Sequence, residues 1–328
     1  MDVKNLFTKQ KMMRTVLLGL IPVALMAVFL YGWRLLVLAA TVAFAAVIAE
    51  YLIMHTINRE KTKVSEAVFV SAALFTLSLP PRTPVWVAVV GIVFGVVFGK
   101  AVFGGFGRNI FNPALVGRCF IYVAFPAHMT MGWAQPFLSL PGGFAAWTTA
   151  ADAVTSATPI ITYNTSGVLT DSLRLFLGTI SGSMGETSAL LILLGGAFMV
   201  YRKVASWQLM VSTIVSGTAL AAILHFAGVA HASGMVAAPP LFTLLAGGYL
   251  FGAVYMVTDP VSAPKTKPAQ WIAGSLVGLI TVVIRSFSLF TEGMMFAILI
   301  VNALTPLIEL QLKQRQDRKK LAGKGAAA

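Results

Sequence analysis

Apolar residues fill this chain in long runs that short polar stretches separate. Because a helix needs roughly 20 apolar residues to cross a bilayer, each long run is a candidate membrane segment. The runs lie near residues 16–31, 35–54, 65–79, 85–103, 111–125, 187–201, 207–228, 239–257, 271–286 and 292–310. This pattern predicts an all-α integral membrane protein with about ten transmembrane segments, five on each side of a long polar stretch.

Two of the runs, 65–79 and 111–125, are short for a full crossing, which indicates half-helices, tilted pieces or re-entrant segments. The grouping of the runs also divides the chain. The expected parts are a first membrane half (1–125), an extracytoplasmic loop (126–186), a second membrane half (187–312) and a basic cytoplasmic tail (313–328).

The basic residues fall mainly on one side of this topology. That side receives Lys4, Lys9, Lys11, Arg14, Arg59, Lys61, Lys63, Lys100, Arg108, Arg202, Lys203, Lys265, Lys267 and the basic residues of the tail. The other side receives only Arg34, Arg82, Arg174 and Arg285. Since cytoplasmic loops collect Lys and Arg, the pattern predicts cytoplasmic termini and an extracytoplasmic 126–186 loop, in a bacterial inner membrane.

An odd number of crossings in each half requires the second half to enter the membrane with the opposite orientation, as in inverted-repeat transporters. Weak sequence echoes support this: 75–80 ends in proline in the first half, and 255–260 does so in the second. Paired proline breaks point to a midplane site where backbone groups meet an ion or cofactor. Two ordinary loops that end in proline are the alternative.

Composition agrees with a membrane protein, since 58% of the 328 residues are hydrophobic, 11% are charged and the mean hydropathy is +0.85. The first eleven residues are polar and basic and lack a small-residue cleavage site, so no removable signal peptide is expected. The net charge of +13 follows from topology rather than from nucleic-acid binding. The single Cys119 excludes an intrachain disulfide and any thiolate metal site built from this chain alone.

Charged residues within or beside predicted membrane segments are candidate functional groups. Glu50, Glu66 and Arg118 are of this kind, and Asp259 lies at the second proline break. We expect Asp259 and Glu66 to be candidates for an ion pathway. Two plainer interpretations stay open: Glu50 and Glu66 pair with Arg59, Lys61 or Lys63, and Asp259 pairs with Lys265 or Lys267.

A glycine-rich corner precedes the fifth run, with Gly107, Arg108, Asn109 and Asn112 as its polar or flexible members. Glycines allow tight backbone turns, and Pro113 suits a helix that begins beside Asn112. The corner could hold a phosphate, a flavin ring or a neighbouring subunit, and it does not match a dinucleotide fingerprint. The later run 185–188 reads as helix-capping residues that open the sixth segment.

The long loop carries a small polar run at 152–159, in which Asp152 leads and Ser156, Ala157 and Thr158 precede Pro159. Pro159 biases Thr158 towards an extended backbone, and the small neighbours are expected to leave its hydroxyl unobstructed. An alcohol is a weak nucleophile, so a separate enzyme would have to activate it. A Ser/Thr-rich loop or a helix cap is the plain alternative.

The run resembles the site at which a dedicated transferase joins FMN, through its phosphate, to a threonine hydroxyl. With the motifs at 107–114, 185–188 and 257–260 and the basic turn ending in Trp207, the chain resembles, over nearly its whole length, one family of membrane subunits. That family contains the RnfD protein of the Rnf ion-translocating oxidoreductase complex and the NqrB protein of the Na⁺-translocating NADH:quinone oxidoreductase. The short leader at 1–11 favours the Rnf member.

The resemblance implies a two-half, urea-transporter-like fold, covalent FMN on Thr158 with Asp152, Ser156 and Ala157 in the attachment motif, and assembly with other Rnf subunits. It implies electron transfer between ferredoxin and NAD coupled to Na⁺ or H⁺ movement. Some relatives also hold riboflavin, which we place near Gly107, Arg108, Asn109 and Asn112. The NqrB protein of the quinone reductase and a non-redox solute channel are the alternatives.

Overall fold

The structure is a computed structural model that describes residues 7–58, 63–149, 157–288, 290 and 292–325. The described chain is mainly helical, with one short parallel strand pair of β1 (Phe7–Thr8) and β2 (Val64–Ser65). The first five long or medium helices are α1 (Lys11–Tyr31), α2 (Arg34–Asn58), α3 (Ala67–Leu77), α4 (Val85–Gly99), which η3 (Ala101–Phe103) follows, and α5 (Pro113–Ala124).

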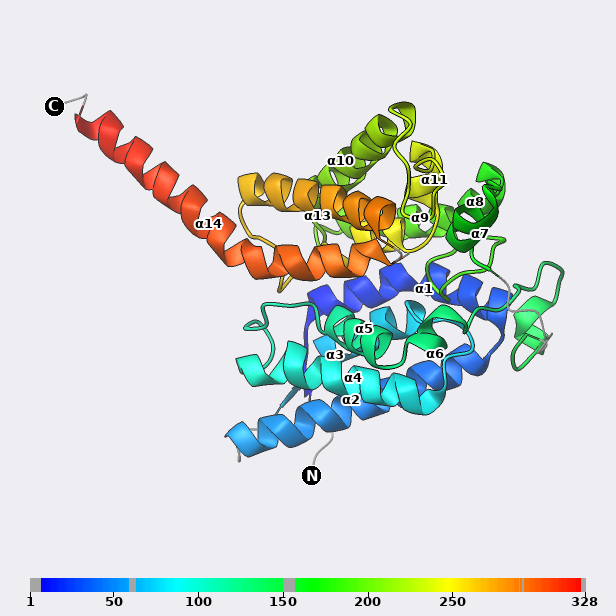
Figure 1. Ribbon diagram of the computed structural model, residues 1–328. Coiled ribbons are helices and arrows are strands. Elements are labelled where there is room, and N and C mark those ends of the chain that lie inside the picture. The colour runs from blue at the N-terminus through cyan, green and yellow to red at the C-terminus, as the bar shows by residue number, and fades with distance from the viewer. Residues whose placement is uncertain (1–6, 59–62, 150–156, 289, 291, 326–328) are drawn as a thin grey trace.

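Short helices occupy the connecting loop: α6 (Pro126–Thr130), η4 (Gly142–Ala145), α7 (Pro159–Ser166) and α8 (Ser172–Leu177). The later helices are α9 (Ala189–Tyr201), α10 (Trp207–Phe226), α11 (Pro240–Leu245), α12 (Tyr249–Phe251), the π-helical η5 (Gly252–Met256), α13 (Lys267–Phe287) and α14 (Gly293–Gly325). Helix α14 continues through residue 312, so the described part of the basic tail prolongs the last segment and projects from the body (Figure 1).

Six described helices are long and apolar enough to cross a membrane. They are Lys11–Tyr31, Arg34–Ile57, Val85–Phe103, Trp207–Phe226, Lys267–Phe287 and Gly293–Arg318. Three more apolar helices, α3, α5 and α9, have only 11, 12 and 13 residues, or roughly 17 to 20 Å of rise. The prediction of a helical, multi-pass membrane protein is therefore confirmed, as is the shortness of the runs at 65–79 and 111–125.

The run at 239–257 does not form the single segment that its hydropathy predicted. Helix α11 ends at Leu245, and the chain resumes as α12 only at Tyr249. Gly247 lies between them with φ of +66°, a conformation that an α-helix cannot accommodate. This break, and the π-helical turn that follows it, give a discontinuous segment of the kind tolerated where backbone is buried inside a membrane protein.

Small residues let the main helix pairs pack closely. Helix α4 packs on α5, and α13 packs on both α10 and α14. A Cβ atom built on Gly95 would lie 2.3 Å from the carbonyl oxygen of Pro113, and one on Gly278 would lie 2.4 Å from that of Thr213. Glycine at these spacings allows the backbones of membrane helices to approach, as in small-xxx-small motifs.

The two ends of the helical body differ. One end, here the terminal end, carries the β1–β2 pair and the corners at 100–112 and 257–266; the other, the loop end, carries α6, α7 and α8 (Figure 1). Helix α3 starts beside β2 and reaches the loop end, where the Leu77 carbonyl accepts from Gly185 N at 2.6 Å. The broken segment runs the other way, because the Met256 carbonyl accepts from Asn112 Nδ2 at 3.5 Å at the terminal end.

Candidate functional site

Three sequence-predicted residues meet around one small cavity at the terminal end. Asn109 and Asn112 come from the glycine-rich corner, and Asp259 comes from the second proline break, almost 150 positions later. The cavity, here the terminal cavity, measures about 20 Å³, which is room for one water-sized species. Its remaining lining is Met13, Ala67, Val70, Ser71, Leu74, Lys100, Phe106, Pro113 and Val261.

The corner owes its shape to glycines and an asparagine cap. Gly104, Gly105 and Gly107 have φ of +95°, +91° and +86°, which side chains with a Cβ rarely adopt. Asn112 caps α5, since its Oδ1 accepts from Ala114 N at 3.0 Å and Pro113 fills the first helical position. Asn109 Nδ2 donates to the Phe111 carbonyl at 3.0 Å. The predicted turn and helix start are thus confirmed.

Gly107 and Arg108, which sequence analysis grouped with these asparagines, lie apart from the cavity. Both residues are exposed, and a Cβ on Gly107 would have no heavy atom within 4 Å. The cavity itself is far smaller than an isoalloxazine ring system. The riboflavin predicted at this corner therefore does not fit the terminal cavity in this conformation, whereas a single ion or water does.

Asp259 is held by its own turn rather than by a lysine. Its Oδ2 accepts from Ser262 N at 3.0 Å and from Ser262 Oγ at 2.7 Å. The Lys265 ammonium instead donates to the carbonyl of Pro260 at 2.5 Å. Among the ion pairs of the described residues, none joins Asp259 to Lys265 or Lys267. The plain loop-pair interpretation of Asp259 is therefore wrong in this structure.

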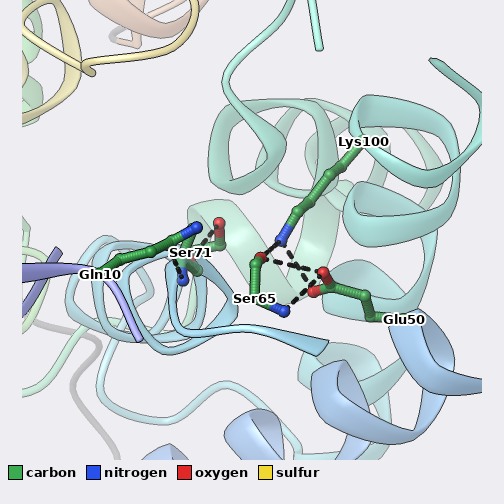
Figure 2. Close-up of polar contacts among 6 residues, drawn as sticks. Gln10, Glu50, Ser65, Ser71 and Lys100 are labelled. Atoms are coloured by element: carbon green, nitrogen blue, oxygen red, sulfur yellow. Dashed lines mark hydrogen bonds and ion pairs between the residues drawn. The ribbon is translucent and has the colours of Figure 1, made fainter. Parts of the chain in front are cut away.

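Behind the terminal cavity lies a buried polar group that sequence analysis missed, here the lysine cluster: Lys100, Glu50 and Ser65 (Figure 2). Lys100 Nζ lies 2.7 Å from Glu50 Oε2 and 2.5 Å from Ser65 Oγ. Ser65 Oγ and Ser65 N donate to Glu50 Oε1 at 3.0 and 3.2 Å. Both charged side chains are only 2% exposed.

Each member of the lysine cluster comes from a different element. Glu50 lies on α2, Ser65 on β2, and Lys100 just after α4. The prediction that Glu50 pairs with Arg59, Lys61 or Lys63 is wrong where the structure tests it, since its partner is Lys100; Arg59 and Lys61 lie outside the described residues. The available sequence signal was that Glu50 and Lys100 each interrupt the end of an apolar run.

Glu66 lies in a separate ion pair beside β2. Arg14 Nε donates to Glu66 Oε2 at 2.9 Å, Arg14 Nη2 lies 2.5 Å from Oε1, and Gln10 N donates to Oε2 at 2.7 Å. The hydrogen-bonded Arg14 guanidinium, and after it the Gln10 amide, hold the pKa of the Glu66 carboxyl below its usual value. Glu66 does not line the terminal cavity.

At the loop end, Thr158 begins α7. Its backbone is extended, with φ of −72° and ψ of 158°, and its Oγ1 accepts from Ile161 N at 3.4 Å. The extended conformation predicted from Pro159 is thus confirmed, and Thr158 is also the helix cap of the plain alternative. Ala157 is exposed, whereas Asp152 and Ser156 lie outside the described residues.

The expectation of an unobstructed Thr158 hydroxyl is wrong for this conformation, because the residue is 9% exposed. It lines a second cavity of about 20 Å³, here the threonine cavity. The lining consists of Trp133, Thr158, Pro159, Ile160, Ile180, Ser181, Gly182, Ser183, Glu186, Gly247, Gly248 and Glu292. In the described chain, the Nε1 of buried Trp133 has no hydrogen-bond partner.

These features suit a phosphoryl group on Thr158. The hydroxyl sits at the N-terminus of the eight-residue α7, where backbone N–H groups and the helix dipole favour an anion. The Trp133 indole offers a buried donor that nothing in the described chain satisfies. The site therefore fits the phosphate of a flavin attached there, with the ring outside a cavity of this size.

Arg118 holds two carboxylates beside the threonine cavity, and these three residues form the arginine cluster. Its Nη1 lies 2.6 Å from Glu186 Oε1, and its Nη2 lies 2.9 Å from Glu292 Oε1. Burial raises the pKa of the Glu292 carboxyl, against the opposing effect of Arg118. A Cβ on Gly248 would lie 2.6 Å from the Glu186 carboxylate, so glycine at the break in the second half gives this carboxylate its place.

The run 185–188 thus has two roles. Ser188 caps α9, as its Oγ accepts from Leu191 N at 3.4 Å, which confirms the capping prediction. Glu186 contributes to the arginine cluster instead, which the capping interpretation did not anticipate. Within the described residues, no three His, Cys, Asp or Glu side chains group as metal ligands.

Comparison with known proteins places the chain in a family. A family model described as the NQR2, RnfD, RnfE family matches residues 3–317. The NqrB protein of the Na(+)-translocating NADH-quinone reductase from Pseudoalteromonas atlantica is 38% identical over 315 residues, which are 94% of this chain and 74% of that protein. Its namesakes from Ectopseudomonas mendocina and Yersinia pestis are 40% and 38% identical, over 80% of this chain and 63% of each relative. The chain belongs to the NQR2, RnfD, RnfE family.

Proposed function

We propose that this chain is a membrane flavoprotein subunit of an ion-translocating oxidoreductase, with FMN joined through its phosphate to Thr158. The observation that carries the proposal is the placement of Thr158 at a helix N-terminus, in a cavity with the unsatisfied Trp133 indole N–H. Asp152, Ser156 and Ala157 complete the attachment motif. A bound flavin accepts and passes on electrons, while the chain's own residues position and shield it.

Maturation requires a separate FMN transferase, since no base in the described cavity contacts the Thr158 hydroxyl. The burial of that hydroxyl adds a condition. We propose that the transferase acts before α7 docks, or that it displaces the α7 start, because an alcohol that is 9% exposed cannot enter another enzyme's site. Other subunits of the complex are the partners for electron transfer.

Two members of the family remain candidates for the complex. The first is the RnfD protein of an Rnf complex, which relays electrons between ferredoxin and NAD, as the sequence motifs suggested. The relatives compared above are all named as the corresponding component of the Na(+)-translocating NADH-quinone reductase, which favours NqrB as the alternative. Ferredoxin-dependent against quinone-dependent activity of the purified complex separates the two.

For the architecture we propose ten crossings in two inverted five-segment halves, 1–125 and 187–312, in a urea-transporter-like arrangement. The opposite directions of α3 and of the broken segment at 240–256 support inverted halves. Helices α3, α5 and α9 would cross only in part. We place the terminal end and both termini in the cytoplasm and the 126–186 loop outside a bacterial inner membrane, as the basic residues favour.

For the ion pathway we propose a cation site at Asp259 in the terminal cavity. A carboxylate, two asparagine side chains and a volume of about 20 Å³ suit one dehydrated monovalent ion. Glu66 lies nearer the surface with Arg14, and we propose that it lines the approach to this site. Riboflavin near the 104–112 corner requires a more open conformation than the one described.

In-gel fluorescence tests the central proposal. The chain expressed with the transferase should fluoresce on a denaturing gel, and Thr158→Ala should abolish the signal. Thr158→Ser is the matched control, because serine keeps both a hydroxyl acceptor and the helix cap. A dark wild-type band would reject covalent flavin and favour a non-redox solute channel. Mass spectrometry should find the added FMN on the peptide that contains Thr158.

A further inference from the structure

The lysine cluster and the terminal cavity form one charged unit, because Lys100 belongs to both. Lys100 lines the cavity together with Asp259, and its ammonium is bound to Glu50 on the far side. Figure 2 shows Lys100 reaching from the end of α4 to Glu50 and Ser65. The other charged groups nearby are occupied elsewhere: Glu66 binds Arg14, and Lys265 binds the carbonyl of Pro260.

Charge counting then gives the unit a definite deficit. Lys100 contributes one positive charge, and Glu50 and Asp259 contribute one negative charge each, so the sum is one negative charge. A buried net charge is strongly unfavourable unless it is compensated. One monovalent cation in a cavity of about 20 Å³ would neutralise the unit, whereas a divalent cation would leave it positive.

We propose that Lys100 is a tethered cation that sets the charge of the terminal cavity, and so makes it selective for one monovalent cation. In this inference Glu50 is a positioning residue. It holds the Lys100 ammonium 2.7 Å away and leaves Asp259 free for the transported ion. The inference rests on the proposed cation site at Asp259 and assigns how that site discriminates between charges.

The chemistry of lysine suits this role. Its ammonium is a compact charge on a flexible four-carbon stem, so it can exchange one carboxylate for another by rotation of its side chain. Asp259 is the other carboxylate that lines the same cavity. When Glu50 holds the ammonium, the cavity attracts a cation; when the ammonium turns to Asp259, the cation is displaced.

A double-mutant cycle on the complex purified in detergent tests the inference. Sodium chloride and calcium chloride are titrated by calorimetry, with choline as the replacing cation. Glu50→Gln should release Lys100 towards Asp259 and weaken Na⁺ binding by about tenfold or more. Lys100→Met should strengthen Na⁺ binding by a similar factor and create Ca²⁺ binding. The double variant restores the charge sum and should bind Na⁺ within about threefold of wild type.

The opposite signs are the decisive result, since a merely structural pair would weaken binding when either partner is removed and would create no Ca²⁺ site. Should Lys100→Met fail to fold, the weaker binding of Glu50→Gln relative to the double variant carries the same information. Lys265→Met is the matched control, because it removes an exposed ammonium close to Asp259 in sequence and should change affinity less than about threefold.

Failure of the inference is distinguishable from failure of the cation site. Unchanged Na⁺ binding in Asp259→Asn, or no Na⁺ binding by the wild-type complex, rejects the site itself and with it the inference. Loss of binding in Asp259→Asn, combined with equal affinities or shifts of the same sign in Glu50→Gln and Lys100→Met, rejects only the role of Lys100.

Discussion

The two buried ionic groups, the arginine cluster at the loop end and the lysine cluster at the terminal end, differ in what they connect. Arg118 comes from α5, whereas Glu186 and Glu292 precede α9 and α14, so the arginine cluster joins the early helices to the late ones. The lysine cluster joins α2, β2 and the end of α4, all within the first 100 residues.

The cations differ as well. A guanidinium presents several donors in a fixed plane and binds two carboxylates at once, as Arg118 does. An ammonium is a single movable charge, and Lys100 has one carboxylate partner. Each cluster adjoins a cavity of about 20 Å³. The contrast indicates that the loop end is built to stay fixed beside Thr158, and the terminal end to exchange partners.

Removing Arg118 should have the largest effect. Arg118→Met leaves the Glu186 and Glu292 carboxylates buried without their cation and should lower the free energy of unfolding by about 5 kcal/mol. Thermal unfolding of the detergent-purified protein measures the loss. Adding Glu186→Gln should restore only part of it, because Glu292 remains. Wild-type stability in Arg118→Met would show that the cluster does not join the two sets of helices.

Removing Lys100 should cost less and be reversible. Lys100→Met leaves one uncompensated carboxylate and should lower the free energy of unfolding by about 3 kcal/mol, since breaking a buried pair is costly. Adding Glu50→Gln removes that charge and should recover most of the stability. The same unfolding assay applies. A double variant as unstable as Lys100→Met would contradict the view that the cost is electrostatic.

The surface pair of Arg14 and Glu66 should have the smallest effect, and one that depends on pH. The pKa of Glu66 is lowered in the folded protein, so its contribution is present above the unfolded value of about 4.3. It is lost as the pH falls through the lower folded value. Wild type and Glu66→Gln should therefore differ in unfolding temperature at neutral pH and converge in acid. A constant difference down to the lowest accessible pH would exclude this linkage.

Hydropathy predicted the long helices well, because apolar length is a local property. The segment at 35–54 became α2, and that at 207–228 became α10, with ends shifted by a few residues. It failed at 239–257, since a hydropathy average cannot register that Gly247 has a positive φ. It also gave no sign that the short α9 follows a glutamate bound to Arg118.

For the site, sequence analysis found residues but not their partners. Asn109, Asn112 and Asp259 were separate candidates, and their meeting depends on a contact between Asn112 and Met256 that no local pattern contains. Lys100 read as a loop charge because its partner, Glu50, lies 50 positions earlier. Thr158 was chosen through its motif, whereas its burial depends on distant residues such as Trp133.

The strand pair at the terminal end has a mechanical consequence. β1 pairs in parallel with β2, with Thr8 opposite Ser65, and the Ser65 hydroxyl contacts both Lys100 and Glu50. Tension on the first residues of the chain is therefore transmitted through two short strands to the lysine cluster. A neighbouring protein that pulled on this leader, or replaced it as the partner of β2, would act on the lysine without approaching it.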